Sequence, residues 1–190
     1  LRPLLVADTL VRFGNGMVYV FFVLVVTDLR TVSFTGFGVT LAPAAFFGVL
    51  LAVEMAVALL SMLPVARLAD RAGLKPVVAL GFSVYAIFPV LLILAPADPW
   101  VFVALFAFSG LRFAGLPAHK ALIVGPAARD EGGSTTGAYY LVRNVVVIPS
   151  ALLGGLLYTR DPVLAFAVAS VVGSLGVLYF LARGKRFQPQ

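Results

Sequence analysis

Long apolar runs alternate with short polar joints along the chain. Six runs are long enough for a membrane-spanning helix, which needs about 20 apolar residues. They cover residues 3–27, 37–65, 76–95, 100–123, 133–158 and 162–182. The strict two-residue alternation of a transmembrane β-strand is absent. The pattern predicts an all-α membrane protein, with residues 1–190 forming a single bundle of six transmembrane helices.

Composition also places the chain in a lipid bilayer. Hydrophobic residues make up 62% and charged residues 12% of the sequence, whereas soluble domains are about 45–50% apolar and about 25% charged. The net charge of +6 does not indicate a nucleic-acid partner, because the basic residues lie in the joints. The sequence has no cysteine, which excludes disulfides, thiolate metal sites and a thiol nucleophile. We expect no cofactor and no metal.

Lysine and arginine are unevenly distributed between the two ends of the runs. One end carries only Arg30 and Arg160. The other carries the remaining basic residues of the joints and tails: Arg2, Arg67, Arg71, Lys75, Lys120, Arg129, Arg183, Lys185 and Arg186. Because cytoplasmic loops are enriched in these residues, we expect a multi-pass protein of the cell membrane with both termini in the cytoplasm. The chain begins at Leu1 without methionine, so we expect a fragment or one half of a larger protein.

Five charged residues fall inside the expected helices: Asp8, Arg12, Glu54, Arg112 and Arg143. Each costs at least about 2.5–3.5 kcal/mol at mid-helix, so each should face protein or water and have a partner. At about 1.5 Å per residue, the last four lie about 14 to 16 Å from the cytoplasmic helix ends, near the middle of a hydrocarbon core about 30 Å thick. The pattern predicts one polar layer at mid-depth.

Polar side chains also share helix faces. Asp8 and Arg12 belong to a stripe of the first helix that continues through Asn15 and Tyr19. The third and sixth runs carry no interior charge, so we expect them to face lipid or packing. The first, second, fourth and fifth helices are expected to line a cleft for substrate or coupling. Its residues would be Asp8, Arg12, Asn15, Tyr19, Glu54, Arg112, Tyr140 and Arg143.

The joint between the second and third runs contains a polar motif: Asp70-Arg71-Ala72-Gly73-Leu74-Lys75. This motif resembles the signature loop of the major facilitator superfamily, G-x-L-a-D-R-x-G-R-K. Ala66 replaces the first Gly, and Leu74 replaces the first basic residue after Gly73. Such short motifs need support from the rest of the chain.

Two further segments resemble the same family. Arg112-x-x-Gly115 is similar to the R-x-x-q-G motif of a fourth helix, with its Gly one position early. Pro149 followed by Gly154-Gly155 is similar to the G-P-x-x-G-G motif, with wider spacing. The short basic tail after the sixth run is typical of a C-terminal half.

The resemblance implies a six-helix half of a major facilitator fold, built from two inverted three-helix repeats over residues 3–95 and 100–182. It implies secondary transport of a small solute by alternating access. This chain would supply one wall of the pathway, and an N-terminal half or a second copy of the chain would supply the other. It also implies a cytoplasmic gate loop formed by Asp70, Arg71, Gly73 and Lys75.

Several interpretations of the buried charges stay open. Asp8 and Arg12 fit a local ion pair at i, i+4. Glu54 has no charged neighbour on its own helix, so it either pairs with another helix or is protonated and couples transport to protons. Arg112 and Arg143 are candidate partners for the two acids. Three arginines against two acids leave one positive charge unmatched, which hints at an anionic substrate.

Two other function classes compete with transport. The lack of cysteine and of any acid–base cluster disfavours a membrane-embedded enzyme, and the single histidine, His119, is expected to lie at the membrane interface. A non-transporting receptor or assembly partner would not need a polar layer at mid-depth. Transport is therefore the function that the sequence favours.

Overall fold

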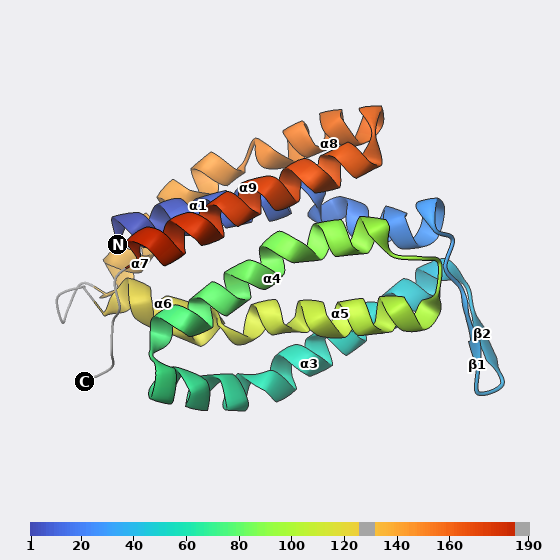
Figure 1. The fold of residues 1–190 in the computed structure, drawn as a ribbon, viewed down its shortest axis with the longest axis horizontal. Coiled ribbons are helices and arrows are strands. Elements are labelled where there is room, and N and C mark those ends of the chain that lie inside the picture. The colour runs from blue at the N-terminus through green and yellow to red at the C-terminus, as the bar shows by residue number, and fades with distance from the viewer. Residues whose placement is uncertain (126–131, 185–190) are drawn as a thin grey trace.

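The computed structural model describes residues 1–125 and 132–184. These residues contain six helical spans that are long and apolar enough to cross a membrane. Their bounds are Arg2–Leu29, Pro43–Ala72, Leu74–Leu94, Pro99–Val124, Gly132–Arg160 and Pro162–Arg183. The spans lie side by side in one bundle (Figure 1), which confirms the all-α fold. Arg129, Lys185 and Arg186 of the predicted cytoplasmic side lie outside the described residues.

Several spans are divided into shorter elements. The first consists of α1 (Arg2–Val18), the 3₁₀ turn η1 (Tyr19–Phe21), α2 (Phe22–Leu24) and the π-helical η2 (Val25–Leu29). The second and third are α3 (Pro43–Ala72) and α4 (Leu74–Leu94). The remaining three are α5 (Pro99–Ala114) with α6 (Leu116–Val124), α7 (Gly132–Val147) with α8 (Ser150–Arg160), and α9 (Pro162–Arg183).

Both predicted ends of the second helix are wrong. Residues 37–41 were expected to be helical, but they belong to a hairpin of β1 (Phe34–Gly36) and β2 (Val39–Leu41). Phe37 and Gly38 form its two-residue turn with φ of 52° and 76°, the positive values of a type I′ turn. The helix begins only at Pro43, because the fixed φ of proline suits the first helical position.

At its other end, α3 continues to Ala72 instead of stopping at Val65. The polar motif is therefore mostly helical. The connection to α4 is reduced to Gly73, whose φ of 87° is readily adopted only by glycine. The hydrophobic pattern missed this end because charged residues can continue a helix beyond the bilayer.

Polar groups cap and support the helices where proline interrupts them. Asp98 and Asp161 cap α5 and α9 by accepting backbone hydrogen bonds from Trp100, Val101 and Val163. Inside α4, the backbone N–H of Val90 donates to the Ser170 hydroxyl of α9 at 3.1 Å. A neighbouring helix thus bonds the backbone beside Pro89, as membrane helices require.

The helices pack in matching pairs. The first span packs through α1 along α9 and against α7 and α8. The fourth span packs in the corresponding way: α5 and α6 lie along α4 and against α3. The two remaining long helices, α4 and α9, pack on each other. Exchanging the first three spans for the last three maps these contacts onto one another, as expected for inverted three-helix repeats, whereas the contact of α1 with α4 has no counterpart of similar extent among the described residues. This arrangement agrees with the six-helix half that the resemblance of the polar motif implies.

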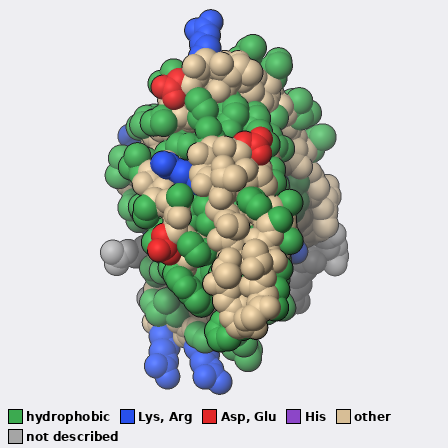
Figure 2. Space-filling view, turned by 90° about the vertical axis from the view of Figure 1, so that its right-hand side faces the viewer, with side chains coloured by type: hydrophobic (Ala, Val, Ile, Leu, Met, Phe, Trp, Pro, Cys, Tyr) green, Lys and Arg blue, Asp and Glu red, His purple; other side chains and the backbone are tan. Residues whose placement is uncertain are grey.

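Burial differs strongly between the spans. Within an apolar stretch of 18 residues in each span, the buried share is 67% in α4, 22% in α3 and 11% in the α7–α8 span. The third helix therefore lies in packing, and the second and fifth present large apolar faces outward. Viewed from the hairpin end, the surface is mostly hydrophobic with a few scattered charged side chains (Figure 2).

The close approach of α8 to α1 yields a test of the packing. A Cβ on Gly154 would collide with the backbone of Met17, whereas one on Gly155 would meet only the Phe21 ring at 3.9 Å. We expect Gly154→Ala to lower the free energy of unfolding by about 1–3 kcal/mol, because overpacking forces backbones apart. Gly155→Ala gains the same helix propensity without the collision. Equal stability of both variants in detergent unfolding would contradict this packing.

Candidate functional site

Asp8 of α1 is the centre of the larger polar cluster. Its side chain has no exposed surface. Its Oδ2 lies 3.1 Å from Nη1 of Arg143 and accepts a hydrogen bond of 3.1 Å from the Tyr139 hydroxyl, both on α7. Nε2 of His119, on α6, lies 3.3 Å from the same oxygen. Helices from three spans thus surround one carboxylate.

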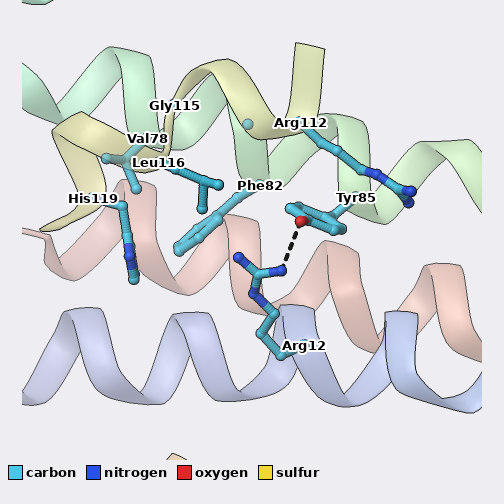
Figure 3. A pocket seen from close by; sticks show the side chains of 9 residues that line it. Arg12, Val78, Phe82, Tyr85, Arg112, Gly115, Leu116 and His119 are labelled. Atoms are coloured by element: carbon cyan, nitrogen blue, oxygen red, sulfur yellow. Dashed lines mark hydrogen bonds between the residues drawn. The ribbon is translucent and has the colours of Figure 1, made fainter. Parts of the chain in front are cut away.

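Arg12 has only a secondary role in this cluster. Its Nε lies 3.4 Å from Asp8 Oδ1, longer than the contacts from the other helices. The local pair predicted from the i, i+4 spacing is therefore present, but it is the weaker part of the network. Nη1 of Arg12 donates to the Tyr85 hydroxyl of α4 at 2.6 Å, and the two side chains face each other (Figure 3).

Tyr85 corrects the expectation that the third helix supplies only packing. It is 4% exposed, and the guanidinium carbons of Arg12 and Arg112 lie 4.4 and 5.3 Å from its ring centroid. A tyrosine combines a large apolar body with one polar tip. Because Tyr85 carries no charge, the pattern of charged residues inside the helices does not reveal it.

Glu54 and Arg112 form the second cluster. Nη2 of Arg112 on α5 lies 2.7 Å from Oε1 of Glu54 on α3, and both side chains are almost fully buried. The Ser109 hydroxyl donates to the same oxygen. The interhelix partner expected for Glu54 is therefore Arg112. Breaking such a pair costs about 3–5 kcal/mol, because it leaves a buried charge without compensation.

The two clusters are joined into one network. Tyr85 contacts both Arg12 and Arg112, and Nη1 of Arg112 lies 3.5 Å from the Asn15 amide oxygen. Two predicted aromatic residues complete the set. The Arg112 guanidinium lies 5.8 Å from the Tyr19 ring centroid, and that of Arg143 lies 4.6 Å from the Tyr140 ring centroid. The structure thus brings together all eight residues predicted for the cleft.

A family model of the Major Facilitator Superfamily matches residues 4–189. The chain belongs to the Major Facilitator Superfamily. None of the curated proteins compared with the chain matches it. Proteins of this superfamily are membrane transporters, and six apolar spans make this member a multi-pass membrane protein. The resemblance seen in the polar motif is thereby confirmed.

The signature motif of this superfamily member lies where α3 meets α4. Asp70 and Arg71 are exposed on the last turns of α3, and no side-chain hydrogen bond or salt bridge joins them to the described residues. Lys75 instead donates to the carbonyl of Leu181 at 2.9 Å, close to the end of α9. A cation at this position is stabilised by the negative, C-terminal end of the α9 dipole. The motif thus ties the sixth span to the α3–α4 connection.

The residues predicted for the cleft do not include four members of the network: Tyr85, Ser109, His119 and Tyr139. His119 was expected at the membrane interface, but it is 4% exposed and lies between Asp8 and Tyr139. The physical reason is the demand of the buried Asp8 carboxylate for donors. The signal was the shared face of Ser109, Arg112 and His119 in the fourth run.

Two cavities adjoin the network. A cavity of about 10 Å³ lies among Arg12, Tyr85, Arg112 and His119, and a cavity of about this size holds roughly one water molecule. The side chains around it are drawn in Figure 3. A larger cavity of about 200 Å³ is bounded by Tyr19, Glu54 and Arg112 together with apolar side chains. Among the described residues, no group of three acidic or histidine side chains could hold a metal ion.

The Asp8 cluster predicts a large stability effect. Asp8→Asn should lower the free energy of unfolding by about 3–5 kcal/mol, because it leaves the Arg143 charge in the bundle without its partner. Asp28→Asn is the matched control, because Asp28 is exposed and such substitutions usually stay within about 0.5 kcal/mol. Denaturant unfolding in detergent measures both. A similar small effect for both variants would show that Asp8 does not hold the helices together.

Proposed function

We propose that this member of the superfamily is a secondary active transporter of a small solute that works by alternating access. The chain would supply one half of the translocation pathway. The observation that carries the proposal is the network of five charged side chains from helices of four different spans. Buried ion pairs add little stability over apolar packing, whereas charges inside a membrane commonly mark a substrate or ion pathway.

The low burial of the second and fifth spans supports the presence of a second half that packs against this one. Leu60 of α3 and Ile148 beside α8 are 78% and 74% exposed, on spans that are the least buried of the six. We infer that these faces pack against a second six-helix half, either an N-terminal half or a second copy of this chain. In such an assembly substrate binds near the midplane between the halves.

The charge distribution supports an orientation and a substrate preference. The N-terminus, the start of α4 and helix α6 lie at the end of the bundle opposite the hairpin (Figure 1), and they carry Arg2, Lys75 and Lys120. We assign this end to the cytoplasm of the cell by the positive-inside rule. Three arginines face two carboxylates in the network. The excess positive charge lies with Arg12 and Arg143, so an anionic group would be accommodated beside the Asp8 cluster.

Glu54 is the candidate for proton coupling. In Glu54→Gln the amide keeps the shape of the carboxyl but cannot bind a transported proton. We expect uptake driven by a pH gradient to lose its stimulation, while solute exchange without a gradient continues. Proteoliposomes holding this chain with its second half allow both measurements. If the variant unfolds more easily but keeps the pH dependence of uptake, Glu54 only holds the bundle together.

Asp70 is the candidate gate residue, and it tests alternating access separately. Because Asp70 is exposed at the cytoplasmic end of α3, Asp70→Asn should leave the fold intact. We expect exchange to slow by about tenfold, equivalent to about 1.4 kcal/mol, with substrate affinity nearly unchanged. Equilibrium binding and exchange kinetics on the same reconstituted sample separate the two effects. Loss of binding with normal exchange kinetics is the outcome that rejects a gating role.

A further inference from the structure

The larger cavity lies between the first and second helical spans, at the irregular part of the first. Its volume is about 200 Å³. Its walls are largely apolar and include Tyr19, Phe22, Phe47 and Leu51, and its polar end is formed by Glu54 and Arg112. The helix changes here from α to 3₁₀ at Tyr19.

The polar end of the cavity has unused hydrogen-bonding capacity. Nε of Arg112 is buried and donates to no group of the described residues. The Ser109 hydroxyl donates to Oε1 of Glu54, and Nη2 of Arg112 forms its salt bridge with the same oxygen. A buried N–H without a partner costs about 1–3 kcal/mol, so a bound molecule that accepts from it gains that energy. One donor and one acceptor are thus presented together.

The net charge of this end excludes an ionic ligand. Glu54 and Arg112 neutralise each other at 2.7 Å. A charged ligand would bring an uncompensated ion into an apolar cavity, which is strongly unfavourable. An anion is better accommodated beside Arg12 and Arg143, whose side chains are partly exposed. The ligand of this cavity should therefore be uncharged.

Size and wall composition restrict the ligand further. An apolar cavity of about 150 Å³ is known to take up benzene, so a cavity of about 200 Å³ accommodates one ring with a small substituent. The rings of Tyr19 and Phe22 stand 5.8 and 5.9 Å from the Arg112 guanidinium carbon. Aromatic walls favour an aromatic or similarly flat apolar body, through offset or edge-to-face contacts.

We propose that this cavity binds a small uncharged molecule with a ring-sized apolar body and one polar group that both donates and accepts hydrogen bonds. A primary amide or a hydroxyl group meets this requirement. The polar group would accept from the Arg112 guanidinium and donate to the Glu54 carboxylate. This rests on the proposed function: it assigns an uncharged ligand to this cavity of the transport pathway, apart from the anionic group that the Asp8 cluster would accommodate.

Three ring compounds of nearly equal size test the proposal. Benzamide is neutral and both donates and accepts, benzoate is anionic, and toluene has no polar group. Binding to the full-length protein in lipid nanodiscs is measured by saturation-transfer NMR and titration. We expect benzamide to bind at least about tenfold more tightly than either analogue, which corresponds to about 1.4 kcal/mol. Benzoate or toluene binding as tightly as benzamide would overturn the proposal.

Filling the cavity locates the binding site. Leu51→Trp and, from the opposite wall, Val23→Phe should each abolish benzamide binding, because the larger side chains occupy the cavity. Leu59→Trp is the matched control on α3, since Leu59 is 67% exposed and does not line the cavity. Unchanged benzamide binding in both filled variants, with the fold intact by circular dichroism, would overturn the site.

Transport separates this proposal from the function on which it rests. Benzamide uptake into proteoliposomes is measured beside binding. Binding that follows the expected order without uptake supports the cavity as a ligand site and counts against transport of that ligand class. Uptake that continues in Leu51→Trp and Val23→Phe would show that the transport route lies elsewhere, and it would overturn the cavity as the substrate site.

Discussion

An ionised carboxylate inside a membrane is stable only when donors surround it, and Asp8 is the residue on which this constraint acts most strongly. Its side chain has no exposed surface, and its donors come from α6 and α7 as well as from its own helix. Removing one partner of such a group costs about 3–5 kcal/mol. The first, fourth and fifth spans must therefore stay together. Close approach of α8 to α1 at Gly154 permits this arrangement, because no side chain separates the two backbones there.

The same constraint explains why the polar residues form one network. Glu54 needs Arg112, and Arg112 in turn is surrounded by aromatic rings and lies near Asn15. Tyr85 contacts arginines of both clusters, so it connects them through the most buried helix of the bundle. Pairing therefore brings together charged side chains from four spans. An apolar cavity lies next to the Glu54–Arg112 pair.

The sequence predicted the features that depend on local free energies. Span number follows from hydropathy, and the pairing of the five charged residues inside the helices follows from the cost of an unpaired charge at mid-helix. Long-range requirements escaped it. The hairpin turn at Phe37 and Gly38 lies in an apolar run that reads as helix, and the extension of α3 to Ala72 depends on residues outside the apolar window. Tyr85 and His119 belong to the network only because partners from other helices need them. Such tertiary demands leave no periodic signal in one sequence.

Accessibility of the network from both sides of the membrane tests the central claim most directly. The chain has no cysteine, so a single Tyr19→Cys can be labelled cleanly by a membrane-impermeant thiol reagent in the assembled protein. Leu178→Cys, on an exposed part of α9, is the control expected to face lipid. Alternating access predicts labelling of residue 19 in right-side-out and in inverted vesicles, with the control unlabelled in both. Labelling of residue 19 from one side only, or from neither, would contradict a pathway that opens in turn to each side.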